Sequence, residues 1–208
     1  MDYTPSDIAF SDSVKAAQER LGSRRQYARQ AEKRPWPTEV NDDLVTFLSR
    51  RDTFYLATAS AAGQPYIQHR GGPPGFLRVL DKTTLGFADL PGNRQYITIG
   101  NLAENPQAFI FLMDYANQTR VKLWGEARAI EGDITLLTRL TDGLSLAKPP
   151  ERAILFELKT WDINCRQHIT PRFTEAEIKP AVDKLYARIL ELEQENEALR
   201  QQLAGARS

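Results

Sequence analysis

Seven short runs of β-type sequence follow one another through the middle of the chain, and they limit the fold more than any other feature. They cover residues 54–60, 65–70, 76–80, 84–88, 107–114, 118–131 and 152–161, with turn residues between them. Runs this close in sequence leave too little chain for parallel crossovers, so we expect antiparallel pairing. Two helical patterns, near residues 94–104 and 133–141, interrupt the series. The sequence therefore predicts a mainly β (α+β) chain, an antiparallel barrel or sandwich with peripheral helices.

Composition and charge exclude several functions. The 208 residues are 41% apolar and include 27 basic and 27 acidic side chains, so the zero net charge gives no overall attraction to nucleic acid. One cysteine, Cys165, cannot form an internal disulfide, and with two histidines it supplies too few ligands for a metal cage. The longest unbroken apolar run, 108–113, is far shorter than the roughly 20 residues of a membrane helix. We expect a cytoplasmic protein that binds no metal, no membrane and no nucleic acid.

Helical patterns flank the β-type region on both sides. Residues 1–50 predict an N-terminal helical arm, in which Val14, Ala17 and Leu21 recur at helical spacing and Asn41 caps a second short helix. Residues 51–173 are then the barrel domain, and residues 174–208 a C-terminal helix that begins with a capping box at Thr174. Pro180 predicts a break at which this helix restarts.

The C-terminal helix contains a heptad repeat. Its a positions are Val182, Ile189, Asn196 and Leu203, and its d positions are Leu185, Leu192 and Leu199. This composition favours two parallel strands, in which Asn196 pairs best with a second asparagine. Arg188 with Glu193, and Glu195 with Arg200, attract across such a pair. The repeat predicts a homodimeric coiled coil; the alternative is an amphipathic helix folded back on its own domain.

The sequence lacks the motifs of several large enzyme classes. It has no GxGxxG after a strand, no P-loop, no GxSxG elbow and no HExxH. Only His69 and His168 could carry protons near neutral pH, and for each a structural role is as good an interpretation. The sequence therefore assigns no catalytic residue.

Three polar groups exceed what a purely structural barrel needs. Gln68, His69 and Arg70 end a predicted strand before a run of glycine and proline, which lets a flat ligand approach the backbone closely. Arg120 and Lys122 fall on one face of another predicted strand. The alternative for this pair is ordinary edge-strand charge.

The third group surrounds the start of a helical pattern. Asn93 and Arg94 follow a Pro-Gly turn and directly precede the pattern, where backbone N–H groups favour an anion. Arg94, Thr98 and Asn101 fall at i, i+4 and i+7, and would present a cation, a hydroxyl and an amide to a phosphate. The alternative is an exposed helix face.

A family resemblance connects these groups. The chain resembles the FMN-binding split-barrel proteins related to pyridoxamine 5′-phosphate oxidase in the segments FYLATASAAGQPYIQHRGGPPGF, LGFADLPGNRQYITIGNLAENPQAFIFLMD and RVKLWGEARAIE, in this order and spacing. It is similar to a flavin-nucleotide-binding branch of that family in SDIAFSDSVKAAQERLGSRRQYA and WDINCRQHI. The resemblance implies an antiparallel split β-barrel and a homodimer that holds FMN in a cleft between two barrels.

The same resemblance implies which residues bind the cofactor. They are Gln68, His69, Arg70, Asn93, Arg94, Thr98, Asn101, Arg120, Lys122, Gln167 and His168. The first three would border the flavin ring and reach its phosphate, and the next four would hold the phosphate. Arg120 matches a position that touches the ring, with Lys122 beside it, and the last two would reach the site from the partner subunit.

The resemblance leads us to expect an FMN-dependent oxidoreductase with an unidentified small-molecule substrate. The segment NCRQHI, followed by the heptad repeat, departs from the arginine and histidine motif that holds pyridoxamine phosphate in the oxidase, so we do not expect oxidation of that substrate. Two alternatives stay open. One is a non-catalytic flavin-binding or interaction module dimerised by its coiled coil, and the other is a haem or deazaflavin binder of the same fold.

Overall fold

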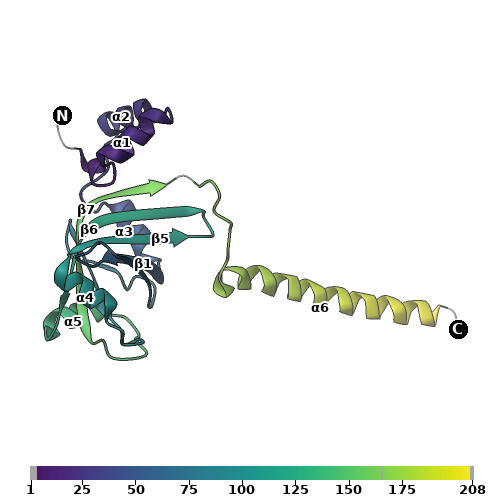
Figure 1. Ribbon diagram of the computed structural model, residues 1–208. Helices are drawn as coiled ribbons and strands as arrows, with labels where there is room; N and C mark the ends of the chain where they lie inside the picture. The colour runs from purple at the N-terminus through teal and green to yellow at the C-terminus, as the bar shows by residue number, and fades with distance from the viewer. Residues whose placement is uncertain (1–3, 165, 207–208) are drawn as a thin grey trace. The chain divides into compact units, whose positions relative to one another are not determined.

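A computed structural model describes residues 4–164 and 166–206 (Figure 1). Its helices are η1 (Pro5–Ile8), α1 (Asp12–Arg20), α2 (Arg24–Lys33), α3 (Asp42–Ser49), α4 (Ile97–Glu104), α5 (Ile134–Thr141) and α6 (Glu175–Gly205). Its strands are β1 (Thr53–Ala59), β2 (Pro65–Gly71), β3 (Arg78–Val79), β4 (Thr84–Asp89), β5 (Gln107–Asp114), β6 (Thr119–Ile130) and β7 (Arg152–Asn164). Each of the seven predicted β-type runs corresponds to a strand.

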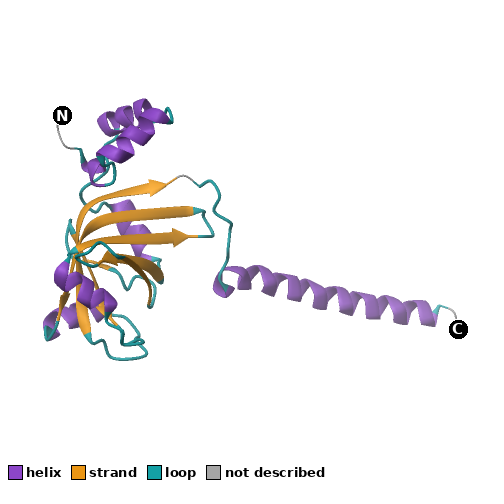
Figure 2. Ribbon diagram, viewed as in Figure 1, coloured by secondary structure: helices purple, strands orange, loops and turns teal. Residues whose placement is uncertain are grey.

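The strands form one sheet in the order β2-β1-β5-β6-β7-β4-β3, and every neighbouring pair is antiparallel. Figure 2 shows the sheet as one curved layer. A β-bulge between Trp124 and Gly125 shifts the register of β6 against β7, and such bulges help a sheet to bend. The predicted mainly β class with peripheral helices is confirmed.

Curvature of the sheet closes the hydrophobic core. Phe54 on β1 packs edge-on against Phe87 on β4, with 5.1 Å between ring centroids, although three strands separate β1 from β4 in the sheet order. Both side chains are almost completely buried, together with Leu56, Ile110 and Phe156 from other strands. A flat sheet could not bring β1 and β4 into contact, so the chain has the split-barrel arrangement.

The two faces of the sheet are distinct because side chains alternate along each strand. Buried residues such as Val121 and Leu123 define the inner face, which faces the core. The residues between them, including Trp124, are partly exposed and define the outer face. The position of a polar residue along its strand therefore decides which face it joins.

The N-terminal arm packs against the outer face through aromatic rings. Trp36 stacks on Trp124 with centroids 4.8 Å apart, and Phe10 lies against Trp36 at 5.3 Å. Trp161 Nε1 donates a hydrogen bond to the Glu39 carbonyl at 2.9 Å. The predicted helix around Val14 is α1, and the predicted Asn41 cap of α3 is present. The sequence analysis did not identify α2 as a separate helix.

Two compact units divide the chain. Residues up to Asp114, with Gln118–His168, form the first, and Tyr115–Asn117 with the chain from Ile169 onward form the second. In the second unit α6 begins with the predicted capping box, in which Glu177 N–H donates to Thr174 Oγ1 at 3.3 Å.

The predicted break at Pro180 is wrong. The helix α6 continues through Pro180, which lies in its second turn. A proline so near the N-terminus removes only one intrahelical hydrogen bond, the bond that its own N–H would give to the Ala176 carbonyl. The capping box and the long helical segment after the proline keep the helix continuous.

Candidate functional site

The polar residues of β2 point to both faces of the sheet. Gln68 and Arg70 lie opposite core residues of β1 and therefore belong to the inner face. His69 lies between them on the outer face, where its ring contacts Tyr55 edge-on at 5.7 Å between centroids. The three neighbouring residues thus divide between two faces of the sheet. Gln68 and Arg70 share the inner-face pocket, and His69 lines only a hollow that adjoins it.

Helix α4 anchors the inner end of this pocket. Thr98 is almost fully buried and donates a hydrogen bond from Oγ1 to Gln68 Oε1 at 2.9 Å. Asn101 is also buried, and its Nδ2 donates to Thr58 Oγ1 at 3.0 Å. Thr98 therefore lines the pocket and holds Gln68, while Asn101 fixes the helix to β1.

The predicted helix start at residue 94 is wrong, because α4 begins at Ile97. Arg94 and Tyr96 have φ angles of 60° and 54°, in the left-handed region that a right-handed helix cannot include. Arg94 consequently lies on a loop and does not share a helix face with Thr98 and Asn101. Two non-glycine residues with positive φ so close together are a local strain, and strain of this kind concentrates at functional sites.

Side chains of the loop hold one another in place. Arg94 Nε donates to Tyr96 Oη at 3.1 Å, and Asn93 Nδ2 donates to Gln95 Oε1 at 3.2 Å. Arg94 and Asn93 are both exposed, so their remaining hydrogen-bonding groups face solvent. The loop thus presents a cation and an amide at the mouth of the pocket.

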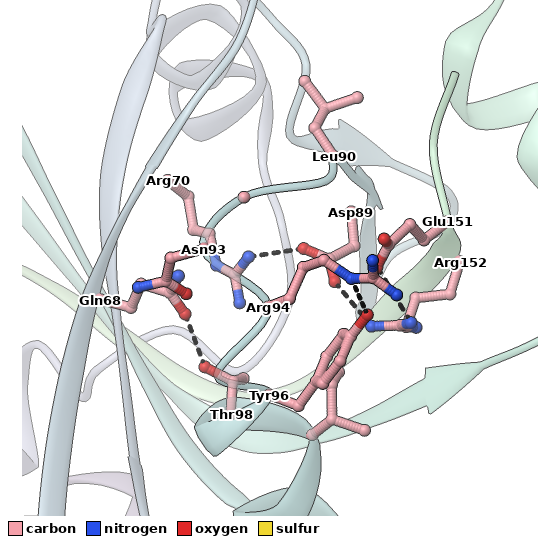
Figure 3. A pocket seen from close by; sticks show the side chains of 12 residues that line it. Gln68, Arg70, Asp89, Leu90, Asn93, Arg94, Tyr96, Thr98, Glu151 and Arg152 are labelled. Atoms are coloured by element: carbon pink, nitrogen blue, oxygen red, sulfur yellow. Dashed lines mark hydrogen bonds and ion pairs between the residues drawn. The ribbon is translucent and has the colours of Figure 1, made fainter. Parts of the chain in front are cut away.

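A buried carboxylate, Asp89, lies at the bottom of the pocket (Figure 3). Arg70 Nη1 is 2.5 Å from its Oδ1, and Arg152 Nη1 is 3.5 Å from its Oδ2. Burial raises the pKa of Asp89 above its ordinary value, although the charges of Arg70 and Arg152 lower it. The Asp89 carboxylate is therefore protonated more readily than an exposed aspartate.

The space enclosed by these residues is small. A hollow of about 50 Å³ lies among Gln68, Arg70, Asp89, Arg94 and Arg152, and an adjoining one of about 140 Å³ shares some of these walls. Figure 3 shows Arg70, Arg94 and Arg152 arranged around Asp89. Sites for whole drug-sized ligands are usually 300–1,000 Å³. This pocket suits a small anionic group better than a complete organic ligand.

Four arginine side chains have a buried Nε without a hydrogen-bond partner among the described residues. They are Arg70 and Arg152, which line the pocket, Arg120 on the outer face, and Arg51. A buried donor left unpaired costs about 1–3 kcal/mol, so such atoms call for an explanation. Nε of Arg152 lies 3.2 Å from a Glu131 carboxylate oxygen, whereas Nε of Arg70 would be satisfied by an acceptor on a ligand in the pocket.

The outer face holds a second polar group. Arg120 and Lys122 lie on this face of β6, which confirms that they share one side of the strand. Lys122 Nζ is 3.0 Å from Asp162 Oδ2 and lies over the rings of Trp36 and Trp124, at 5.5 and 5.0 Å from their centroids. Within one chain, this group and the Arg70 pocket therefore open on opposite faces of the sheet.

The two residues predicted to reach a partner subunit lie after β7. Gln167 and His168 are exposed in a turn, and His168 has a φ of 63°. Neither adjoins the Arg70 pocket in its own chain. Cys165, the one cysteine, lies outside the described residues.

Sequence reasoning missed four polar residues of the pocket. Asp89, Tyr96, Glu151 and Arg152 all line it, but none was assigned to the site. Asp89 ends the apolar run LGFAD, and Arg152 begins the last strand. A charged residue that terminates an otherwise buried strand is a usable signal, since it needs a partner wherever the strand ends.

The described chain has no candidate metal cluster and no candidate membrane helix. No group of three or more His, Cys, Asp or Glu side chains in residues 4–164 and 166–206 is arranged to hold a metal ion. None of the helices in the same residues is long and apolar enough to span a bilayer.

Comparison with known proteins defines the class of this molecule. Residues 40–165 match the family model described as pyridoxamine 5′-phosphate oxidase, and this segment is more than half of the chain. The chain therefore belongs to the pyridoxamine 5′-phosphate oxidase family. The comparison with curated proteins gave no match.

Several solved structures are similar to the chain at low sequence identity. HupZ from Group A Streptococcus is 16% identical over 64% of this chain and 100% of that one, with a TM-score of 0.48. An FMN-binding protein from Syntrophomonas wolfei subsp. wolfei is 13% identical over 70% and 97%, with a TM-score of 0.46. A protein from Clostridium acetobutylicum related to general stress protein 26 is 16% identical over 67% and 99%, with a TM-score of 0.45.

Proposed function

We propose that this protein is a flavin-dependent oxidoreductase that binds FMN, with the phosphate of the cofactor in the Arg70 pocket. The observation that carries the proposal is the buried, unpaired Nε of Arg70 in a phosphate-sized hollow of a chain that belongs to this family. Arg94, at the mouth of the hollow, would supply a second positive charge, and Asn93 a further donor. Guanidinium groups match phosphate oxygens in both charge and geometry.

Asp89 is compatible with an incoming phosphate. It holds Arg70 through an ion pair in the absence of ligand, and a phosphate would compete for the same guanidinium group. Because burial raises the pKa of Asp89, the carboxyl group can take up a proton as the phosphate arrives. Arg152 has two further acidic partners, Glu151 at 3.1 Å and Glu131 at 3.2 Å, and stays paired when Asp89 is neutral.

The flavin ring is too large for the hollow and needs another surface. In the proposed arrangement Arg120 and Lys122 contact the ring from the outer face of a sheet, and His69, which lines the hollow that adjoins the Arg70 pocket, borders the ring. Arg120 and Lys122 lie on the opposite face from the Arg70 pocket within one chain, so an FMN molecule that contacts both groups draws them from two copies. This requirement supports a homodimer with FMN at the interface, to which the partner contributes its exposed turn with Gln167 and His168.

Bound flavin supplies the redox chemistry by transferring electrons at its ring, so the protein needs no conspicuous acid, base or nucleophile. The residues of this chain would bind the phosphate, orient the ring and place a positive charge beside it. A cation near the ring favours the anionic reduced form, which is a role for Arg120 or Lys122. The substrate is a small molecule other than pyridoxamine phosphate, because the chain lacks the arginine and histidine motif for that substrate.

The visible spectrum of the purified protein tests the proposed function. We expect absorption bands of an oxidised flavin, release of FMN on heating, identified by its mass, and bleaching of the bands under anaerobic reduction. A colourless protein that also fails to bind added FMN would contradict the proposal and favour a non-catalytic interaction module. Release of a haem or a deazaflavin would contradict the choice of cofactor.

A further inference from the structure

Helix α6 presents an apolar stripe that no other described residue of its own compact unit covers. None of its residues is buried in the described structure. Its heptad side chains are 37–65% exposed: Val182 37%, Leu185 65%, Ile189 48%, Leu192 40%, Leu199 55% and Leu203 62%. A continuous row of exposed aliphatic side chains on a 31-residue helix is unfavourable in water and marks a protein interaction surface.

A polar residue within the stripe indicates how the partner helix runs. Asn196 occupies an a position, and its Nδ2 donates to the Leu192 carbonyl of its own helix at 3.0 Å. In a parallel pair in register, Asn196 faces a second Asn196 and the two amides can bond to each other. In an antiparallel pair an a residue faces a d residue of the partner helix. Because every d residue of this repeat is a leucine, Asn196 would then face a leucine. An amide against leucine loses hydrogen bonds, so the parallel pair is favoured.

Charges beside the stripe agree with a second copy as the partner. Arg188 and Glu195 occupy g positions, while Glu193 and Arg200 occupy e positions. In a parallel pair each g residue faces the e residue five positions further along the partner, so both pairs join opposite charges. Among residues 4–164 and 166–206, the ion pairs of Arg188 run along its own helix, to Glu191 at 2.9 Å and Glu195 at 3.8 Å.

We propose that α6 forms a two-stranded, parallel and in-register coiled coil with α6 of a second copy of this chain, with Asn196 facing its counterpart. The occupant of the stripe is thus the same helix of another molecule and not a different protein. This association does not depend on the bound cofactor. It holds whether or not the barrel binds FMN, so the two proposals succeed or fail separately.

The test uses the full chain with one cysteine at a d position. Cys165→Ser removes the native thiol and Leu199→Cys places a new one where the two helices of a parallel, in-register pair touch. We expect oxidised glutathione to join two chains through this cysteine, because d side chains of such a pair are direct neighbours. In an antiparallel pair the two cysteines are far apart, so a lack of cross-linked dimer would overturn the proposal.

Charge exchange then tests orientation. One variant carries Glu193→Arg with Arg200→Glu at the e positions, and another carries Arg188→Glu with Glu195→Arg at the g positions. In a parallel pair each variant alone brings like charges together, so we expect its cross-linking to fall at least about tenfold, and mixing the two variants to restore it. In an antiparallel pair g faces g and e faces e, so mixing the two variants would bring like charges together and would not restore cross-linking.

A matched control introduces the same two charged residue types on the far side of the helix. Gln194→Arg with Gln201→Glu introduces one arginine and one glutamate at f positions, which do not face the partner. Its cross-linking should equal that of the parent chain, and circular dichroism should show the same helix content in every variant. Loss of cross-linking in this control, or its persistence in the e variant alone, would contradict the proposed pairing.

Discussion

Replacing Arg70 and Arg94 with alanine together is expected to raise the Kd for FMN by at least about 100-fold. Each arginine would give the phosphate a charge-assisted hydrogen bond worth about 1.5–3 kcal/mol, and a combined loss of about 3 kcal/mol exceeds a factor of 100 in Kd. Riboflavin has the same ring but no phosphate, so its affinity should change by less than about threefold. Fluorescence titration with both flavins measures the two effects.

Two controls separate recognition of phosphate from damage to the fold. Arg70 balances the buried Asp89, so the double variant must first be shown to unfold cooperatively. Arg94 is exposed, and Arg94→Ala alone should keep the wild-type stability while raising the Kd about tenfold. Arg128→Ala removes an exposed arginine of β6 that does not line the pocket. It should change neither the stability nor the Kd for FMN. Unchanged FMN affinity in the double variant would show that the phosphate does not bind here.

Gly125→Ala is expected to destabilise the barrel by about 3 kcal/mol or more. Gly125 is buried beside the β-bulge in β6. An added Cβ would collide with the Glu157 carbonyl oxygen and lie 2.7 Å from Cζ of Phe156, which is itself fully buried. Neither neighbour can move without disturbing the core, and overpacking of this kind costs 1–3 kcal/mol or more. Urea unfolding followed by circular dichroism measures the free energy of unfolding.

Gly100→Ala provides a matched control with the opposite sign. Gly100 is exposed within α4, and an added Cβ there meets no described atom within 4 Å. Alanine is favoured over glycine inside a helix by about 0.8–1.0 kcal/mol, so this variant should be slightly more stable than the wild type. Equal unfolding free energies for the two variants would contradict the packing assigned to Gly125.

Much of the barrel follows from the sequence because strands there obey two local rules. Apolar residues alternate along the predicted runs, and turn residues separate them, as at the connection Ala61-Ala62-Gly63 between β1 and β2. The Asn41 cap of α3 and the capping box at Thr174 were predictable for the same reason, since a cap depends on residues only a few positions apart.

The site was harder to predict because it depends on backbone conformation and on distant pairs. Nothing in the spacing of Arg94, Thr98 and Asn101 shows that Arg94 and Tyr96 adopt left-handed φ angles and delay the start of α4. The pairing of Asp89 with Arg70 and Arg152 joins residues 19 and 63 positions apart. Asp89 faces Arg152 in the pairing of β4 with β7, whereas its contact with Arg70 on β2 depends on the curvature of the sheet. Neither contact has a local signature in the chain.

Recognition of the flavin phosphate is tested most directly by equilibrium titration of the wild-type protein, freed of ligand, with FMN and with riboflavin under the same conditions. Because only FMN carries the phosphate that would satisfy Arg70 and Arg94, we expect its Kd to be at least about 100-fold lower than that of riboflavin. Equal affinities for the two flavins, or no binding of either, would contradict a phosphate site in this pocket.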